Sequence, residues 1–386
     1  MTIVFYCQHV LGLGHYMRSL AIVRALAPHR VVFVTGGPDV PAGLGPHVVH
    51  ERLPVLSMDE DFSQMLVQGD PEAVKAERRE RLLAILERER PEAFVVELYP
   101  FGRRAFEFEL VPALQAIREG AFGRPRVLCS LRDILVEKAD PGKYQGRVLK
   151  RLAEFFDGLL VHSDPALFPL EETFPRAREI AIPVEYTGFV VERPSPGARE
   201  RVRAEMGLAE ADTLIVASAG GGKVGSELLF AAVAAYPLLQ LSPRPRLEVF
   251  SGPFLDETAY KRLGADACPH SGIRVSRFAG NFPDLLAGAD VSLSLAGYNT
   301  TMNVLAAGVP ALVWPFAQNR EQSMRALRLQ SMGALGVLGQ ADLEPRRLAR
   351  LIEALARKGR PEAGCPVRLD GAERAARLIL HGQRRL

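Results

Sequence analysis

The sequence of 386 residues predicts an α/β protein built from two doubly wound, Rossmann-like domains with parallel sheets. In the first half of the chain, short apolar runs alternate with amphipathic helical patterns, as in successive βαβ units joined by right-handed crossovers. A segment with two prolines and a glycine, residues 191–197, then interrupts the pattern. The alternation restarts after it, and the chain is long enough for two separate hydrophobic cores.

The first predicted domain comprises residues 1–190, where apolar runs of strand length are separated by longer segments with helical periodicity. Its predicted strands are Ile3–Cys7, Val31–Val34, Ala93–Val96, Val127–Cys129 and Gly158–Val161. Its predicted helices are Tyr16–Ala27, Pro71–Arg90, Ala105–Glu119 and Gly146–Phe156. The helix at 71–90 is crowded with Glu and Arg at helical spacing, so we expect a solvated outer face without a function of its own.

The second predicted domain comprises residues 191–368 and opens with a strand, a helix and a strand: Leu214–Ser218, Ser226–Tyr236 and Leu247–Ser251. Its most informative stretch is residues 294–322, SLAGYNTTMNVLAAGVPALVWPFAQNREQ, which follows a run that reads as a buried strand. The GYNTT turn opens a helix that breaks at Gly308, and the strand Ala311–Trp314 leads into a polar loop, residues 318–322. Parallel strands end at one edge of a sheet, so these polar groups are expected at a ligand-binding edge. A basic amphipathic helix, about Gly371 to Gln383, ends the chain.

Composition limits the classes of function. A hydrophobic fraction of 48% and a charged fraction of 24% are typical of a soluble globular protein, and a net charge of +3 is too small to imply a nucleic-acid partner. The four scattered cysteines, Cys7, Cys129, Cys268 and Cys365, lack metal-ligand spacing and predict a reduced, cytoplasmic protein without a structural metal. No basic region precedes the first apolar run and no run approaches ~18 apolar residues, so neither a signal peptide nor a membrane span is expected.

The loop after the first strand is a candidate catalytic segment. Gly12 and Gly14 let the backbone approach a ligand, and His15 follows at the start of a helix. The helix dipole disfavours the imidazolium there, which predicts a neutral His15 that can accept a proton; a capping residue without chemistry is the alternative. The third glycine and the downstream acid of a dinucleotide fingerprint are missing, which argues against NAD.

A second candidate segment follows the first strand of the second domain. Ser218, Gly220, Gly221, Gly222 and Lys223 combine clustered backbone N–H groups with a hydroxyl and a positive charge, as in a phosphate cradle. The spacing is not that of a Walker A motif, so ATP hydrolysis is not expected, and a flexible strand–helix turn is the alternative reading. The unpaired N–H groups that open the helix near Thr300 and Thr301 also suit an anionic guest.

Charged residues follow two further strands of the first domain. Glu97, Arg103 and Arg104 follow one strand, and Asp133 follows another. Asp133 either pairs with a neighbouring arginine, Arg132 or Arg104, or orients His15 or an acceptor hydroxyl. We take His15 and Asp133 as the catalytic candidates. His162, which also ends a strand, is interpreted as a structural histidine.

Together these motifs resemble those of GT-B glycosyltransferases, in the superfamily that includes the MurG-type UDP-N-acetylglucosamine transferases. The resemblance rests on the GxGH loop, the glycine-rich loop and GYNTxxxxLxxGxPxLxxPxxxxREQ. PFGRRAFEFEL (100–110), CSLRDILV (129–136) and LVHSDPALFPLEE (160–172) resemble an uncharacterised branch of predicted bacterial glycosyltransferases. The resemblance implies two domains facing a cleft, with residues 369–386 packing back on the first domain.

The resemblance also implies metal-independent, inverting transfer of a sugar from a nucleotide-diphosphate donor, first of all UDP, to a hydroxyl acceptor, with no other cofactor. His15 matches the histidine that deprotonates the acceptor hydroxyl. The matching donor-site residues are Ser218, Gly220, Gly221, Gly222 and Lys223 at the diphosphate, Arg277 and Phe278 at the base, Gly297, Asn299, Thr300 and Thr301 at the helix start, and Glu321 and Gln322 at the sugar. The acceptor-side candidates are Gly12, Gly14, Arg18, Glu97, Arg103 and Arg104.

One position departs from the superfamily. Asn303 stands where a glutamate usually binds both ribose hydroxyls. A carboxylate accepts two hydrogen bonds from a diol, whereas a carboxamide accepts through one oxygen and donates through nitrogen. We hypothesise that the ribose is held differently, in a way that admits a deoxyribose nucleotide.

Two other functions stay open at the level of sequence. A nucleotide-sugar hydrolase would use water in place of the acceptor, and its known examples share an opening similar to GLGHYMRSLA, residues 12–21. A non-catalytic nucleotide-sugar-binding protein is suggested by Asn303 and by the lack of an assured catalytic acid. The sequence leaves the acceptor, the sugar, the oligomeric state and a peripheral membrane contact open.

Overall fold

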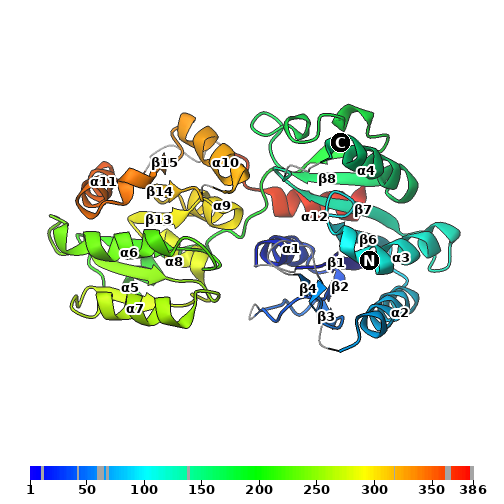
Figure 1. Cartoon of the computed structure of the whole chain (residues 1–386), viewed down its shortest axis with the longest axis horizontal. Coiled ribbons are helices and arrows are strands. Elements are labelled where there is room, and N and C mark those ends of the chain that lie inside the picture. Colours follow the sequence, from blue (N-terminus) through cyan, green and yellow to red (C-terminus); the bar gives the residue numbers. More distant parts are fainter. Residues whose placement is uncertain are drawn as a thin grey trace. The chain divides into compact units, whose positions relative to one another are not determined.

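The computed structural model describes residues 1–9, 13–40, 43–58, 65–66, 69–136, 140–316, 318–360 and 367–382 (Figure 1). The chain splits into two compact units, Met1–Val190 with Val367–Leu386 and Val191–Pro366. Each unit is a parallel sheet flanked by helices, so the predicted α/β class with two doubly wound domains is confirmed. The chain thus returns to the first unit at Val367, where the sequence places the corresponding boundary after residue 368.

In the described part of the first unit, a seven-stranded parallel sheet has the order β3-β2-β1-β6-β7-β8-β9. Its strands are β1 Thr2–Cys7, β2 Arg30–Thr35, β3 Val48–Arg52, β6 Ala93–Glu97, β7 Arg126–Arg132, β8 Gly158–His162 and β9 Val184–Tyr186. A short antiparallel pair, β4 Ser57–Met58 and β5 Met65–Leu66, lies outside this sheet. The helices are α1 Gly14–Ala25, α2 Pro71–Glu89, α3 Glu107–Glu119, α4 Pro141–Phe155 and α12 Gly371–His381, with 3₁₀ turns at Arg104–Phe106, Leu170–Glu172 and Ala177–Glu179.

Helices cover both faces of this sheet because alternate residues of its strands point to opposite sides. On β1, Ile3 and Phe5 belong to a buried cluster with residues of α1 and α12. Val4 and Tyr6 belong to a second cluster with residues of α2, α3 and α4. The C-terminal helix α12 therefore contributes to the core of the first unit. Backbone hydrogen bonds from Phe189 N to Arg368 O (2.8 Å) and from Gly371 N to Phe189 O (3.1 Å) hold the two crossing segments together there.

Several elements of the first unit differ from the sequence prediction, and the short pair β4 and β5 is among those not predicted. Strands β3 and β9 were not predicted, because β3 is a partly exposed edge segment with a polar end and β9 is three residues long. Helix α4 begins at Pro141 rather than at residue 146. The side chain of Asp140 accepts a hydrogen bond from Lys143 N (3.0 Å) and Pro141 occupies the first helical position, so the cap starts the helix ahead of its apolar face.

The second unit, in the residues described, has a six-stranded parallel sheet in the order β12-β11-β10-β13-β14-β15. Its strands are β10 Leu214–Ser218, β11 Arg246–Phe250, β12 Ile273–Ser276, β13 Val291–Leu295, β14 Ala311–Trp314 and β15 Gly336–Val337. Its helices are α5 Ala198–Glu205, α6 Ser226–Ala235, α7 Glu257–Ala267, α8 Phe282–Gly288, α9 Tyr298–Ala307, α10 Arg320–Ser331 and α11 Pro345–Lys358, with 3₁₀ turns at Tyr236–Leu238 and Gln340–Leu343. The prediction of a polar loop at 318–322 was partly wrong, because Arg320 to Gln322 form the first turn of α10.

Each sheet has one topological switch point, where strands consecutive in the chain diverge to opposite sides. In the first unit it lies between β1 and β6, and in the second between β10 and β13. Open α/β sheets bind ligands beyond the carboxyl ends of the strands at such a point. The loops after β1, β6, β10 and β13 are therefore the places to look for function, and they carry the motifs that the sequence singles out.

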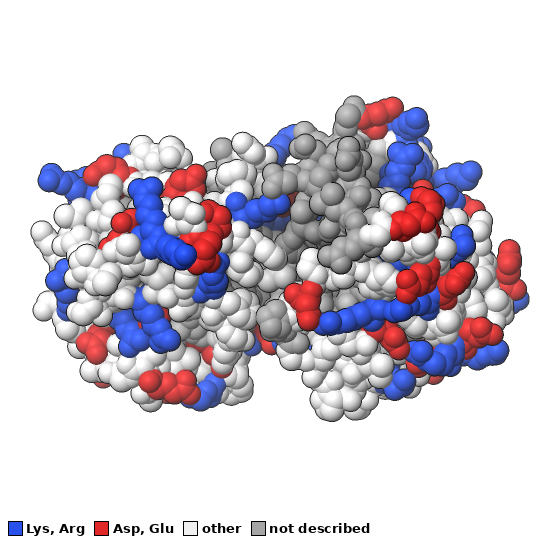
Figure 2. All heavy atoms as spheres, turned by 60° about the horizontal axis from the view of Figure 1, so that its bottom comes forward, with Lys and Arg blue, Asp and Glu red and all other residues white. Residues whose placement is uncertain are grey.

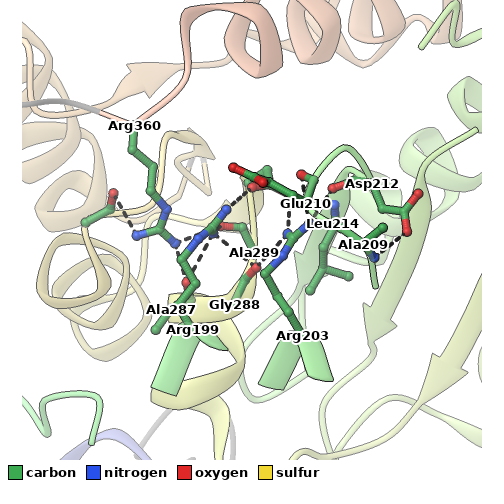
Figure 3. Close-up of polar contacts among 12 residues, drawn as sticks. Arg199, Arg203, Ala209, Glu210, Asp212, Leu214, Ala287, Gly288, Ala289 and Arg360 are labelled. Carbon is green, nitrogen blue, oxygen red and sulfur yellow. Dashed lines mark hydrogen bonds and ion pairs between the residues drawn. The ribbon is translucent and has the colours of Figure 1, made fainter. Parts of the chain in front are cut away.

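Arginines bind the carbonyl groups at the end of helix α8 (Figure 3). Arg199 Nη1 donates to Gly288 O and Ala289 O (both 3.2 Å), Arg203 Nη1 to Gly288 O (3.4 Å) and Arg360 Nη2 to Ala289 O (2.7 Å). The last carbonyls of a helix lack intrahelical partners and carry partial negative charge, which cations offset. Helix α5 and the segment after α11 are thereby attached to α8.

The surface is polar and mixed in charge. Figure 2 shows Lys and Arg side chains interspersed with Asp and Glu side chains on the face presented, consistent with the net charge of +3. In the described residues, no helix is both long and apolar enough to cross a membrane. Helix α2 carries the expected exposed ion pairs, such as Arg81–Glu77 at 2.7 Å. One residue of this helix, Arg78, is instead completely buried.

Candidate active site

The first site lies at the switch point between β1 and β6. Helix α1 begins at Gly14, so His15 lies in its first turn and Arg18 lies one turn later on the same side. Strand β6 ends at Glu97. His15 Nδ1 is 2.6 Å from Glu97 Oε1, and Arg18 Nη2 donates to the same oxygen at 2.8 Å. The Glu97 side chain is completely buried, whereas that of His15 is 22% exposed.

The environment determines the protonation of this pair. Burial lowers the pKa of His15 to about 4, against the opposing effect of the Glu97 charge, so the imidazole is neutral at pH 7. Burial alone would raise the pKa of Glu97, but the hydrogen bond with His15 and the guanidinium groups of Arg103 and Arg18 hold it well below its ordinary value. A neutral imidazole has one N–H, and the Glu97 carboxylate places it on Nδ1. Nε2 is then a proton acceptor, as in a carboxylate-oriented general base.

The loop that follows β6 brings Arg103 to the same carboxylate. Leu98 and Arg103 both have positive φ, 67° and 60°, a conformation that non-glycine residues rarely adopt. Hydrogen bonds from Leu98 N to Ser130 O (2.8 Å) and from Phe106 N to Arg103 O (2.9 Å) fix the loop. The Arg103 side chain is 7% exposed, and its Nη2 lies 3.6 Å from Glu97 Oε2. Arg104, the next residue, is exposed and opens a 3₁₀ turn.

The other first-domain candidates are placed as follows. Asp133 is buried after β7, with its Oδ1 3.8 Å from Arg132 Nε, which is the arginine pairing that the sequence left as one alternative. The carboxylate beside His15 is that of Glu97, which the sequence assigned to the acceptor side. Gly12 lies outside the described residues. His162 is structural, as predicted: its ring nitrogens lie 2.7 Å from Ser130 Oγ and 3.0 Å from Thr187 Oγ1, and burial lowers its pKa to about 3.

Sequence reasoning missed the buried Arg78, which supports the loops around this site. Its guanidinium donates to Glu109 Oε2 (2.8 Å), Glu109 Oε1 (2.6 Å), Gln8 Oε1 (2.7 Å) and Pro54 O (2.5 Å). These contacts join α2 and α3 to the ends of β1 and β3. The signal was present in the sequence, because Arg78 lies at helical spacing between Val74 and Leu82, on the face of α2 that faces the core.

The second site lies at the switch point between β10 and β13. Ser218 at the end of β10 is in register with Ser294 of β13, and its hydroxyl accepts a hydrogen bond from Gly220 N (3.1 Å). Gly220 and Gly222 have positive φ, 64° and 85°. A Cβ on Gly222 would overlap Ser251 O, and a Cβ on Gly252, which also has positive φ, would overlap the backbone of the glycine loop. The glycines therefore let two loops pack backbone to backbone, and Gly252 is a requirement that the sequence analysis did not identify.

The start of helix α9 lies beside this glycine loop. Gly297 precedes the helix and provides no side-chain cap. Thr300 Oγ1 is 3.5 Å from the position that a Cβ on Gly220 would occupy. Within the described chain, the buried hydroxyls of Thr301 and Ser294 have no hydrogen-bond partner. Helix N–H groups, glycine-loop N–H groups and hydroxyls thus converge at one edge of the sheet, which is the donor set of a phosphate site.

The remaining donor-side candidates lie on the loops and helices around this edge. Arg277 and Phe278 follow β12; the Arg277 side chain donates to Leu255 O (2.9 Å), pairs with Glu257 (2.5 Å) and lies 4.1 Å from the Tyr260 ring centroid. Phe278 is 45% exposed. Lys223 is exposed beyond the glycine loop, and Asn299 lies in the first turn of α9. The side chain of Arg277 thus holds its own loop, and its backbone carbonyl accepts from Gly252 N (3.0 Å).

Two helices carry the last predicted contacts. Glu321 and Gln322 lie in the first turn of α10, where Gln322 Oε1 accepts a hydrogen bond from Phe316 N (3.1 Å). Asn303 is partly buried on α9, and among the described residues its carboxamide has no hydrogen-bond partner. Arg325 was missed by the sequence analysis: it is fully buried, donates to Ala296 O (3.4 Å) and lies over the Tyr298 ring at 5.3 Å. It attaches α10 to the turn before α9.

Metal ligands do not gather at either site in the part of the chain described, where no group of three or more His, Cys, Asp or Glu side chains is placed to hold an ion. The polar groups at the second site are instead N–H donors, hydroxyls and amides. Phosphate is a ligand that such groups bind directly.

Comparisons with known proteins agree with this arrangement. Residues 250–364 match the glycosyltransferase family 28 C-terminal domain. Over 167 residues the chain is 29% identical to a UDP-N-acetylglucosamine–N-acetylmuramyl-(pentapeptide) pyrophosphoryl-undecaprenol N-acetylglucosamine transferase of Brucella anthropi, an alignment that spans 41% of each chain. The chain spans 41% to 62% of the length of the first curated relatives that it matches.

Solved structures share the fold over nearly the whole chain. MurG of Acinetobacter baumannii has a TM-score of 0.56 at 18% identity and covers 98% of this chain and 99% of its own. The UDP-GlcNAc 2-epimerase of Methanocaldococcus jannaschii has a TM-score of 0.60 at 12% identity, with 99% and 100% covered. At these identities the likeness shows the fold alone. The chain therefore shares the fold of MurG, and residues 250–364 of its second unit are similar to the glycosyltransferase family 28 C-terminal domain.

Proposed function

We propose that the protein transfers a sugar from a nucleotide-diphosphate donor to a hydroxyl acceptor, with inversion at the sugar and without a metal ion. UDP is the first nucleotide to test, because the matched Brucella relative is named for a UDP-linked donor. The observation that carries the proposal is the partly buried His15–Glu97 pair, with 2.6 Å between Nδ1 and Oε1, at the switch point of the first sheet. The N–H groups and hydroxyls that we assign to the donor diphosphate lie at the switch point of the second sheet.

In the proposed reaction, His15 Nε2 accepts the proton of the acceptor hydroxyl while the oxygen attacks the anomeric carbon of the donor sugar. Glu97 holds the Nδ1–H and stabilises the imidazolium that forms. The bond from the anomeric carbon to the diphosphate breaks on the opposite face, which inverts the configuration. The charge that develops on the leaving diphosphate is met by the N–H groups of the glycine loop and of the start of α9, with Thr300 and Lys223. These N–H, hydroxyl and ammonium groups can stabilise the leaving diphosphate without a metal ion, so we expect transfer to persist in EDTA.

Donor binding is tested by thermal unfolding with UDP, GDP, dTDP, ADP, CMP and NAD at millimolar concentration. A ligand at ~100 times its dissociation constant adds about 2.7 kcal/mol of stability. We expect one nucleoside diphosphate to stabilise the protein, and Thr300→Val to weaken this effect. Thr258→Val, which changes an exposed residue of α7, is the matched control. No stabilisation by any nucleoside diphosphate would show that the donor proposal is wrong.

Product analysis separates transfer from the alternative reaction. The same base can activate water, and a solved epimerase shares the fold, so the fold does not choose among these reactions. Release of free sugar and nucleotide at an undiminished rate without any acceptor would identify a hydrolase. Release that depends on an added hydroxyl compound, with a glycoside as product, would identify the transferase. Both reactions require the neutral His15.

A further inference from the structure

Arg103 is a buried cation whose hydrogen-bonding capacity is largely unused. Its side chain is 7% exposed. In the described residues, Nε and Nη2 are buried and have no hydrogen-bond partner. The nearest opposite charge is Glu97 Oε2, and at 3.6 Å from Nη2 it is too far for a hydrogen bond. A buried guanidinium normally engages its donors with carboxylates or carbonyls, as Arg78 does in the same unit.

The charges around Glu97 do not balance. Glu97 carries one negative charge, and two arginines face it, Arg18 at 2.8 Å and Arg103 at 3.6 Å. His15, the third group at this carboxylate, is neutral. Arg18 and His15 both form hydrogen bonds with Oε1 of Glu97. Arg103 interacts only with the other oxygen, Oε2, at a longer distance. A buried positive charge that is not matched by a nearby anion is costly, and a bound anion removes that cost.

The backbone holds Arg103 in this position. Its φ of 60° is in the left-handed region, and the Phe106 N to Arg103 O hydrogen bond of 2.9 Å closes the turn behind it. Buried aromatic side chains, Tyr99, Phe101 and Phe106, anchor the loop on the core. A strained, well-anchored conformation at a polar site is typical of residues that contact ligands.

We propose that the acceptor carries an anionic group, a phosphate or a carboxylate, that the guanidinium of Arg103 binds while the reacting hydroxyl faces His15. A planar guanidinium matches the two oxygens of either group, whereas a neutral hydroxyl offers no charge to offset. Arg103 and His15 contact the two oxygens of one carboxylate, so the anion and the reacting hydroxyl are close together in the acceptor. The proposal rests on the proposed function only in assigning this anion to the acceptor.

The binding of anions can be measured without any donor or turnover. Protein labelled with ¹⁵N in its histidine rings is titrated with inorganic phosphate in one arm and with acetate in the other, at constant ionic strength set with sodium chloride. The His15 signals are identified by their loss in His15→Gln. We expect one of the two anions to shift these signals saturably in the unsubstituted protein, and the arm that does so distinguishes a phosphate from a carboxylate.

Two arginines provide the matched variants. Arg103→Gln removes the buried charge, and Arg124→Gln removes the same charge from an exposed residue of the same unit. We expect Arg103→Gln to weaken anion binding at least tenfold and Arg124→Gln to leave it within twofold. Arg103→Lys, which keeps the charge, is measured as well in case the glutamine variant does not fold, and it should bind more weakly than the unsubstituted protein.

Two results would overturn the proposal: no saturable shift with either anion, or equal affinities in the Arg103→Gln and Arg124→Gln variants. The donor proposal fails separately, through the absence of stabilisation by nucleoside diphosphates. Anion binding together with no nucleotide effect would leave the Arg103 site standing and reject the transferase. Stabilisation by a nucleoside diphosphate without anion binding would leave the donor proposal standing and reject the Arg103 site.

Discussion

One buried carboxylate, Glu97, contacts His15, Arg18 and Arg103 in the candidate active site. The two arginines keep it ionised and the carboxylate keeps His15 in one tautomer, so each group sets the state of the others. Burial explains why the histidine is neutral, and the carboxylate explains which nitrogen is available as a base.

Replacing His15 by Gln should lower the rate of transfer by about 10²- to 10⁴-fold, the usual contribution of a general base. The fold should be little affected, because the glutamine can still donate to Glu97, and stabilisation by the nucleotide should be unchanged because that site lies in the other unit. Initial rates and thermal unfolding with UDP test this. A variant that keeps more than a tenth of the activity would rule out the proposed role of His15.

Asn303 is the position where the sequence departs from the superfamily that it resembles, and we hypothesise that it alters donor recognition. Its carboxamide has no hydrogen-bond partner among the described residues, so Asn303→Glu should leave the fold intact and let a carboxylate accept from both ribose hydroxyls. We expect UDP to bind more tightly to Asn303→Glu, and the unsubstituted protein to bind dUDP nearly as well as UDP. Calorimetric titrations measure both, and a variant that binds UDP no more tightly would contradict the hypothesis.

At the scale of elements, the glycine loop of the second unit depends on a neighbouring loop. Gly252 has a φ of 82°, and a side chain there would overlap residues 220–222. Gly252→Ala should therefore reduce the free energy of unfolding by about 1–3 kcal/mol and weaken nucleotide binding. Gly264→Ala, on helix α7 with open space around it, should be neutral or stabilising by about 0.5–1 kcal/mol. Equal effects of the two substitutions in denaturant unfolding would refute this account of the loops.

Helix α2 stabilises the first unit through Arg78 rather than through its exposed ion pairs. Arg78→Met would leave Glu109 buried without its cation and should cost about 3–5 kcal/mol of stability. Arg79→Met, at the exposed neighbouring position, should change the free energy of unfolding by less than about 0.5 kcal/mol. Urea unfolding of both variants tests the difference, which should be absent if the Arg78–Glu109 pair contributes nothing.

At the scale of the whole molecule, buried histidines make stability depend on pH. Burial lowers the pKa of His15 to about 4 and that of His162 to about 3, whereas both titrate near 6.5 in the unfolded chain. Below pH 6.5 the unfolded state therefore binds protons that the folded state does not, so stability falls as the pH is lowered. The slope should be about 1.4 kcal/mol per pH unit for each histidine between pH 6 and pH 4.

This pH dependence is measured by urea unfolding at several pH values. His162→Gln, whose amide does not titrate, should be less stable at pH 7 but should lose stability less steeply towards pH 4. The hydroxyls of Ser130 and Thr187 remain available to the amide as partners. A variant with the same slope as the unsubstituted protein would show that His162 is not responsible for it.

Most of the fold was predictable because its determinants are local. Apolar runs such as those of β1 and β10 are buried on both faces of a parallel sheet, and this burial appears directly in the sequence as uninterrupted hydrophobic residues. The edge strands β3 and β9 were missed because they are short or partly exposed. The start of α4 was misplaced because Asp140 and Pro141, rather than apolar periodicity, set it.

The sequence by itself determined the α/β class and indicated the candidate loops, because glycine, proline and apolar patterns act within a few residues. Only the tertiary structure decided which carboxylate serves His15. Glu97 is 82 residues away in the chain, and it meets His15 because β1 and β6 are neighbours at the switch point of the sheet. Likewise, only the structure showed that Arg78 is buried against Glu109 and that Gly252 packs against residues 220–222. Burial and close backbone contact arise only when separate segments pack together.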